Sequence, residues 1–138
     1  MNMKCPTREN TVTEFHQKFN HDIDAPWTSK LLELRMKLIK EESNEVIEEF
    51  TSMIVDIERG KAVTAEQKSR LLKELCDLQY VLSGAAVALG LNEMQVAFTR
   101  VHNSNLSKLG LDGKPIYRKD GKVIKGPNYA PPELRDLV

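Results

Sequence analysis

Residues 41–45 read Glu-Glu-Ser-Asn-Glu, and residues 74–77 read Glu-Leu-Cys-Asp. Side chains at positions i, i+3 and i+4 of a helix share a face, so Glu42 projects with Glu45, and Glu74 projects with Asp77. Glu41 stands beside Glu45. Two helices folded back on each other would gather these carboxylates in one cleft, where like charges repel unless a cation neutralises them. Because Mg²⁺ is held by carboxylate oxygens, the two stretches predict a metal site.

The first stretch lies in a long predicted helix, because residues 30–58 contain no Gly or Pro and their apolar residues follow the helical period. At roughly 100° per residue, Glu42 falls inside the apolar sector, Glu45 on its edge and Glu48 opposite it. A carboxylate turned toward the core must be paired or must ligate a metal, because burying it alone is costly. A buried pair with Arg35, which lies on the same face, is the alternative for one of these acids.

The second stretch belongs to a helix that we expect to pack against the first. Residues 59–61, Arg-Gly-Lys, break the preceding helix, and Thr64 with Gln67 has the spacing of a capping box. The connection is short, so the two helices should form an antiparallel hairpin. Spacing alone does not place Glu74 opposite Glu42.

Two further helices flank this hairpin. Apolar residues at helical spacing predict a first helix over residues 11–19, capped by Thr11 or Thr13, and a fourth helix from Asn92 to about residue 108. Small residues at 84–86 would let another helix approach closely. In the loop before the long helix, the single tryptophan at position 27 packs as a lid on the core or, alternatively, offers a surface on which a base stacks.

The pattern changes after Leu109. Residues 114–118 and 122–125 indicate a small β-hairpin, or two extended arms around a turn. We therefore expect an all-α fold, an antiparallel bundle of four to five helices with a short C-terminal hairpin or extended tail. A single domain would span residues 1–138, with its helical core at about 11–108 and a basic extended tail at 109–138.

Composition narrows the class of protein. The net charge is zero, which argues against a nucleic-acid binder or a protein of anionic membranes, but residues 41–58 hold seven acids and no Lys or Arg, whereas residues 100–138 hold eight Lys or Arg and four acids. This division suits a site for both a cation and a polyanion, although two solvated faces would give it as well. Cys5 and Cys76 form no CxxC motif, and no apolar leader or membrane span is present, so we expect a cytoplasmic protein with reduced thiols.

Other carboxylate chemistries fit the sequence less well. No His has a Glu three residues before it, as a di-iron bundle would need, and His and Cys are not clustered for zinc. A glycosidase uses two carboxylates, and more than two gather here. Calcium loops and P-loops are absent. Elimination leaves Mg²⁺, with Mn²⁺ as a possible substitute, in a helical acidic cleft that acts on phosphate esters or anhydrides.

The two acidic stretches resemble the EExxE…ExxD signature of the all-α nucleoside triphosphate pyrophosphatases. This superfamily includes MazG, the dimeric dUTPases, dCTP pyrophosphatase and phosphoribosyl-ATP pyrophosphohydrolase. Further matches lie at residues 14–16, at Asn105-x-x-Lys108 and at the closing GKPIYRKDGKVIKGPNYAPPEL, so the resemblance covers roughly residues 11–134 and is closest to a MazG-like, phosphoribosyl-ATP pyrophosphohydrolase-like subgroup.

The resemblance implies a hydrolase that cleaves the α–β anhydride of an NTP or dNTP to the monophosphate and pyrophosphate with Mg²⁺. It implies that the metal ligands are Glu42, Glu45, Glu74 and Asp77, and that Glu41 and Glu45 serve the chemical step, Glu41 as a further ligand or by orienting the attacking water. Asn105 and Lys108 would touch the nucleotide. Charge and position add Lys122, Lys125 and Tyr129 as phosphate contacts, and we assign the base pocket to His16, Phe15 and Trp27.

Apolar side chains left on the surface of a two-helix hairpin, at Phe50, Met53, Ile54, Leu82 and Leu89, are buried by a second subunit in the family, which implies a homodimer or a dimer of dimers. The alternative function is a non-catalytic helical module that binds nucleotides or proteins. The base and sugar stay open among dUTP, dCTP, a modified nucleotide and phosphoribosyl-ATP, of which the last fits least well.

Overall fold

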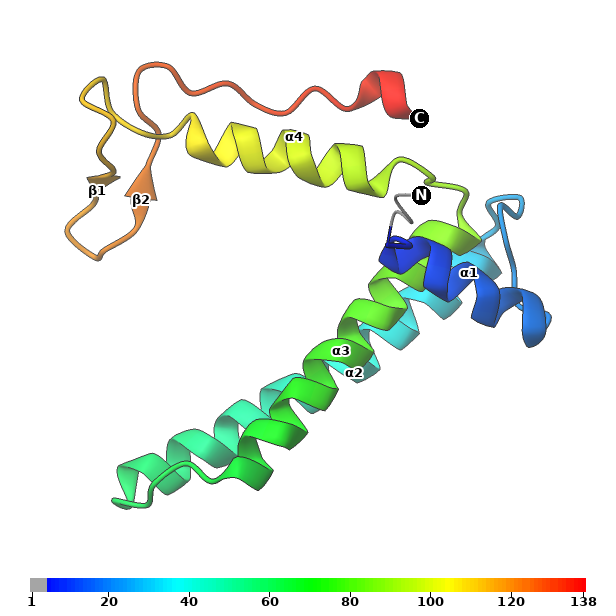
Figure 1. The fold of residues 1–138 in the computed structure, drawn as a ribbon, viewed down its shortest axis with the longest axis horizontal. Coiled ribbons are helices and arrows are strands. Elements are labelled where there is room, and N and C mark those ends of the chain that lie inside the picture. The colour runs from blue at the N-terminus through cyan, green and yellow to red at the C-terminus, as the bar shows by residue number, and fades with distance from the viewer. Residues whose placement is uncertain (1–4) are drawn as a thin grey trace. The chain divides into compact units, whose positions relative to one another are not determined.

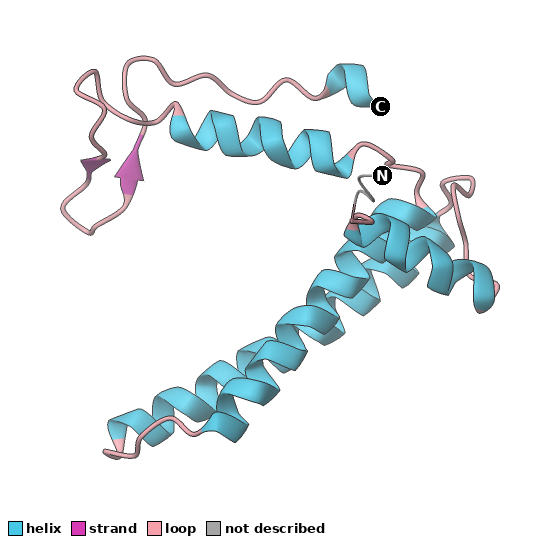
Figure 2. Cartoon of the chain, in the orientation of Figure 1, coloured by secondary structure: helices cyan, strands magenta, loops and turns pink. Residues whose placement is uncertain are grey.

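The computed structural model describes residues 5–138, which form two compact units, one ending at Asn92 and one from Glu93 to Val138. The first unit contains α1 (Arg8–Lys18), α2 (Ser29–Glu58) and α3 (Ala65–Ala88). The second contains α4 (Met94–Leu106), β1 (Ile116–Tyr117), β2 (Val123–Ile124) and a closing 3₁₀ turn, Arg135–Leu137. The regular secondary structure of the described chain is therefore helical apart from one small hairpin, which confirms the predicted all-α class (Figure 2).

Helices α2 and α3 pack along each other as the predicted hairpin (Figure 1). Helix α2 begins after Thr28, whose hydroxyl accepts a hydrogen bond from the Leu31 amide at 3.2 Å. The turn between the helices contains Gly60, whose φ of +79° lies in the left-handed region that favours glycine. Thr64 and Gln67 then form a reciprocal capping box at the start of α3. Both local signals that define the hairpin are confirmed.

Helix α1 begins earlier than predicted, at Arg8. Its capping residue is Thr7, which forms a capping box with Asn10, so the assignment of the cap to Thr11 or Thr13 is wrong. The Thr11 and Thr13 hydroxyls instead donate to carbonyl oxygens four residues earlier, inside the helix. All three threonines are acceptable caps by residue type. Thr7 is the cap because the helix extends one turn further toward the N-terminus than predicted.

Helix α1 packs on the small residues of α3, as their size predicts. A Cβ atom at Gly84 would lie 3.3 Å from Nε2 of His16 and 3.4 Å from a guanidinium nitrogen of Arg35. Val12, on the same face of α1 as His16, is also buried. The core of this unit therefore lies where α1 crosses α3, beside the first turns of α2.

The loop between α1 and α2 covers the C-terminal end of α3. The last carbonyls of a helix lack partners within it, and here Asp24 N, Ala25 N and Trp27 Nε1 donate to the carbonyl oxygens of residues 87, 88 and 89 at 3.0, 2.9 and 2.9 Å. The predicted core lid is wrong for Trp27, because its side chain is 61% exposed and only the indole N–H is bound. The indole fixes the loop and leaves its ring faces open.

The second unit is built on α4. Asn92 is not its cap, since Glu93 occupies that position without a side-chain hydrogen bond, and the helix ends at Leu106. The predicted hairpin is confirmed in short form, with Ile116 opposite Ile124 in an antiparallel register. The chain then returns along α4, where the Ser104 hydroxyl donates to the carbonyl of residue 130 at 2.7 Å.

The buried ring of His16 makes the stability of the first unit dependent on pH. Its Nδ1 lies 2.7 Å from the Asp22 carbonyl oxygen, and burial lowers the pKa of the imidazole. The unfolded chain takes up this proton near pH 6.5, and the folded chain does so only at lower pH. The stability that neutral His16 provides is therefore complete above about pH 6.5 and is lost as the pH falls toward the lowered pKa.

We predict that the melting temperature of the wild type falls between pH 7 and pH 5 and that His16→Gln flattens this fall. Circular dichroism melts at several pH values measure both proteins. The matched control is His102→Gln, which changes an exposed histidine on α4 and should keep the wild-type slope. Equal slopes for wild type and His16→Gln would contradict the assignment.

Candidate metal centre

Three of the predicted ligands meet across the α2–α3 hairpin. Glu42 and Glu45 of α2 and Glu74 of α3 each offer a carboxylate oxygen, and these atoms all lie within 4.8 Å of one another. The i, i+3 spacing places the two α2 carboxylates on one face, and the register of the hairpin brings the α3 carboxylate to them. Helical spacing alone left this last step open.

The Glu42 carboxylate has the surroundings of an ion ligand. Its Oε2 atom is buried and has no hydrogen-bond partner in the described chain. The alternative pair with Arg35 is absent, because no ion pair within residues 5–138 includes this buried guanidinium. A buried charged oxygen without a partner is costly, so Glu42 fits a cation better than it fits a structural role.

The electrostatics of the cluster agree with this interpretation. Contact with the Glu74 carboxylate raises the pKa of Glu45, and the charges of Glu42 and Glu74 raise it further. A divalent cation would remove this repulsion by occupying the space between the oxygens. Three carboxylates with no nitrogen or sulfur donor among them form a donor set suited to a hard ion such as Mg²⁺ or Mn²⁺.

Two other predicted residues lie outside the converging set. Asp77 is bound by a lysine that the sequence analysis missed: its Oδ2 lies 2.7 Å from Nζ of Lys73, which also lies 3.3 Å from Glu74 Oε1. Glu41 is exposed, with its carboxylate 3.8 Å from the Lys37 ammonium. The roles of Asp77 and Glu41 stay predictions. The i, i+4 spacing from residue 73 to residue 77 was the signal available for the missed lysine.

The predicted nucleotide contacts of the tail belong to the second unit. Lys108 Nζ donates to Asn105 Oδ1 at 2.8 Å, and Lys125 Nζ lies 4.4 Å from the centre of the Tyr129 ring. The Gly126 amide donates to the Lys108 carbonyl at 2.8 Å, which ties the segment that carries Lys125 and Tyr129 to the end of α4. A side chain at position 126 would clash with the backbone oxygen of residue 109, at 2.2 Å, so glycine is required for this approach.

The remaining predicted contacts lie on the hairpin, for Lys122, and on α1, for His16 and Phe15. Lys122 is exposed on the hairpin, where its amide donates to the Asp120 carboxylate at 3.2 Å. His16 is 3% exposed and its Nδ1 is engaged by the loop, whereas the Phe15 ring stacks on Phe19 with 4.4 Å between ring centres. No contact joins His16 to the carboxylate cluster among the hydrogen bonds of the described residues, and its role in base binding stays a prediction.

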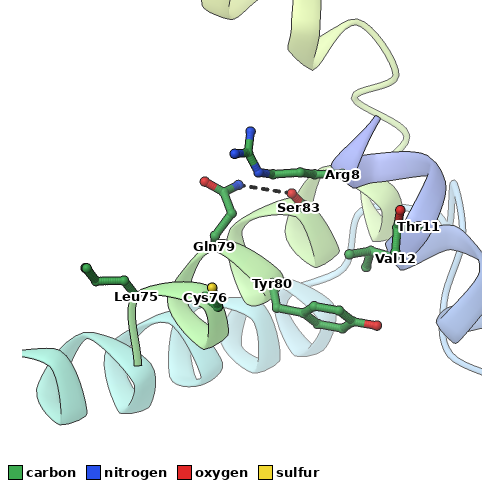
Figure 3. A pocket seen from close by; sticks show the side chains of 8 residues that line it. All are labelled: Arg8, Thr11, Val12, Leu75, Cys76, Gln79, Tyr80 and Ser83. Atoms are coloured by element: carbon green, nitrogen blue, oxygen red, sulfur yellow. Dashed lines mark hydrogen bonds between the residues drawn. The ribbon is translucent and has the colours of Figure 1, made fainter. Parts of the chain in front are cut away.

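A pocket of about 390 Å³ lies between α1 and α3 (Figure 3). Its lining includes Arg8 and Tyr80, together with Gln79, whose amide donates to the buried Ser83 hydroxyl at 3.1 Å. At roughly 100° per residue, Gln79 lies about 140° from Glu74 around the helix axis. The pocket is therefore separate from the carboxylate cluster.

Comparison with known proteins places the chain in a family. The sequence pattern of the phosphoribosyl-ATP pyrophosphohydrolase family matches residues 12–105. The chain belongs to this family. The matched region contains both acidic stretches, and membership in the phosphoribosyl-ATP pyrophosphohydrolase family confirms the resemblance to the all-α NTP pyrophosphatases. A pyrophosphohydrolase is therefore the class of enzyme to which the family points.

The chain is also similar to a solved structure from Exiguobacterium sp. 255-15, whose description as an NTP pyrophosphohydrolase is provisional. The two share 24% identity over 97% of this chain and 93% of the other, with a TM-score of 0.45. None of the curated proteins matches the chain. Among residues 5–138, no helix has both the length and the hydropathy that crossing a membrane requires.

The cluster predicts stabilisation by a divalent cation. We expect Mg²⁺ or Mn²⁺ to raise the melting temperature by several degrees, because a ligand at a hundred times its Kd stabilises the folded state by about 2.7 kcal/mol. Glu42→Gln should remove this shift without lowering the melting temperature of the metal-free protein, since it also relieves repulsion. Differential scanning fluorimetry measures both effects. Glu48→Gln, one exposed acid on the same helix, is the matched control, and an equal loss there would contradict the site.

Proposed function

We propose that this protein is a Mg²⁺-dependent nucleoside triphosphate pyrophosphohydrolase, which cleaves the α–β anhydride of an NTP or dNTP to the monophosphate and pyrophosphate. The observation that carries the proposal is the convergence of Glu42, Glu45 and Glu74 across the hairpin of a chain in this family. Removal of damaged or unwanted nucleotides from the cellular pool, with dUTP or dCTP as candidates, would be its task. The exposed free thiols of Cys5 and Cys76 suit a cytoplasmic protein.

In this proposal Glu42, Glu45 and Glu74 hold the metal, and Asp77 joins them as the fourth ligand. The ion, when bound, supplies a Lewis acid that polarises phosphoryl oxygens and lowers the pKa of water. The water oxygen bonds to the α-phosphorus, the bond to the bridging oxygen breaks, and pyrophosphate leaves with that oxygen. Glu41 or Glu45 orients the water and accepts its proton on a carboxylate oxygen.

The remaining contacts serve the nucleotide. The Asn105 amide and the Lys108 ammonium bind the nucleotide, and Lys122, Lys125 and Tyr129 bind phosphate oxygens through two charges and a phenol hydroxyl. This assignment is supported by the excess of Lys and Arg over acids in residues 100–138. For the base, we keep His16, Phe15 and Trp27 as candidates. The exposed ring faces of the indole support stacking there.

Pyrophosphate release tests the proposal directly. We expect turnover with Mg²⁺ from a panel of canonical and damaged NTPs and dNTPs that includes dUTP, dCTP and phosphoribosyl-ATP. Glu45→Gln should lower kcat more than tenfold, in the range of about 10²–10⁴ that the loss of a positioned base costs, without unfolding the protein. Glu48→Gln should keep wild-type turnover. Binding without release across the panel would favour a non-catalytic nucleotide-binding module.

We also propose that a second copy of the chain covers α2. This helix carries two apolar stripes, one facing α3 and another in solvent that consists of Leu32, Met36, Ile47, Phe50 and Ile54, which are 42–66% exposed. At roughly 100° per residue these five positions lie within about 60° of one another around the helix. A contiguous exposed apolar stripe of this kind marks an interaction surface, and a homodimer or a dimer of dimers would bury it.

A charge in this stripe should separate the copies. We expect the wild type to migrate as a dimer or larger at micromolar concentration in size-exclusion chromatography with light scattering, and Ile54→Arg to shift it toward the monomer. Leu111→Arg changes an 82% exposed leucine of the second unit and is the control. A monomeric wild type would end the proposal.

A further inference from the structure

The structure contains a cation at the carboxylate site that nothing in the proposed function uses. The Lys73 ammonium lies 2.7 Å from Asp77 Oδ2 and 3.3 Å from Glu74 Oε1. Its positive charge also lowers the pKa of Glu45, against the effect of the neighbouring acids. One ammonium thus acts on three of the four carboxylates that we assign to the metal.

The ion pairs of Lys73 explain why Asp77 stays apart from the converging carboxylates. A lysine ammonium has three donors and no acceptor, and two of the Lys73 contacts are spent on acids of its own helix, one a neighbour in sequence and one four residues on. The contacts with Asp77 and Glu74 raise the pKa of Lys73 above its usual range. The Asp77 oxygen nearest the ammonium is therefore already occupied.

The lysine and a hard divalent ion compete for these carboxylates, because both bind the oxygen lone pairs and two cations held close together repel each other. We propose that Lys73 is the internal counter-cation of the site: its ammonium neutralises Glu74 and holds Asp77 while no divalent ion is bound, and it leaves both when one binds. This inference rests on the metal site of the proposed function.

The position of Lys73 allows the exchange. Its side chain is 62% exposed and its stem is flexible, so the ammonium can move into solvent without disturbing the packing of α3. Glu74, by contrast, has a side chain only 14% exposed and stays between α2 and α3. The lysine is thus a positioning residue that acts through Asp77 and Glu74, and it sets how tightly the site binds a metal.

The test is the affinity of the nucleotide-free protein for Mn²⁺, measured by isothermal titration calorimetry and by the electron paramagnetic resonance signal of free Mn²⁺. Lys73→Met removes the competing ammonium, and the loss of its two ion pairs, at the usual strength of pairs made by an exposed lysine, corresponds to a Kd roughly twofold to thirtyfold lower than in the wild type. Lys73→Arg keeps the charge and should keep the wild-type Kd within about twofold.

The matched control is Lys37→Met, which removes one positive charge beside Glu41 and leaves Glu74 and Asp77 untouched. It should change the Kd much less than Lys73→Met. An equal change in Kd for both variants would show that only the overall charge of the protein matters, and it would overturn the inference. A Kd of Lys73→Met that is equal to or higher than that of the wild type would overturn it as well. A crystal structure with Mn²⁺ should show the Lys73 ammonium outside ion-pair distance of Asp77, and an intact pair beside the bound ion would overturn it too.

The outcomes separate this inference from the proposed function. If the wild type binds Mn²⁺ but releases no pyrophosphate, the proposed function is contradicted. The Mn²⁺ affinities of wild type and Lys73→Met then still decide the role of Lys73. A wild type that binds no Mn²⁺ overturns both. Tighter Mn²⁺ binding by Lys73→Met, together with pyrophosphate release by the wild type, supports both the inference and the proposed function.

Discussion

The constraint on the first unit is electrostatic: the packing of α2 on α3 brings three carboxylates together, and their repulsion lowers the stability of the fold. Glu42, Glu45 and Glu74 meet because α2 and α3 form a hairpin, and their mutual repulsion opposes folding except where the Lys73 ammonium offsets it at Glu74. The hairpin is held by packing of α2 on α3, by the ion pair of Arg70 with Glu49 at 3.1 Å, and at its ends by the capped turn at Gly60 and the loop bound to residues 87–89. A bound divalent ion would add a further link between α2 and α3, so metal binding and hairpin stability are thermodynamically linked.

Local signals predicted most of this hairpin. The helical period of residues 30–58, the break at Gly60 and the capping box at Thr64 depend only on near neighbours in sequence, and all three are present. The first helix was predicted less well because Thr7, Thr11 and Thr13 are equally suitable caps, and packing on α3 decides how far the helix extends. The open ring faces of Trp27 were also outside local reasoning, since the indole is fixed by a carbonyl sixty-two positions away.

The carboxylate site likewise has features that local spacing predicts and features that long-range packing determines. The pairing of Glu42 with Glu45 follows from i, i+3 spacing, and the inward direction of Glu42 follows from its place in the apolar sector, which its buried oxygen confirms. The approach of Glu74 is a long-range event that depends on hairpin register, and family resemblance supplied it in advance of the geometry. Sequence alone did not single out Lys73, because an exposed i, i+4 ion pair on a helix usually adds little stability, and only its position beside the carboxylate cluster makes it important.

Helix α2 links the metal site to association. Its α3-facing side carries Glu42 and buries Leu31 and Val46, and its other side presents an apolar stripe that includes Met36 and Ile54 to solvent. An apolar surface this wide on one helix favours burial on more than one side, and α3 covers one of them. A second copy packed on the other side would therefore restrict the motion of the helix that carries two ligands, which reduces the conformational entropy that metal binding must overcome. In this arrangement the subunit contact and the carboxylate cluster are coupled through one rigid element, although no residue belongs to both.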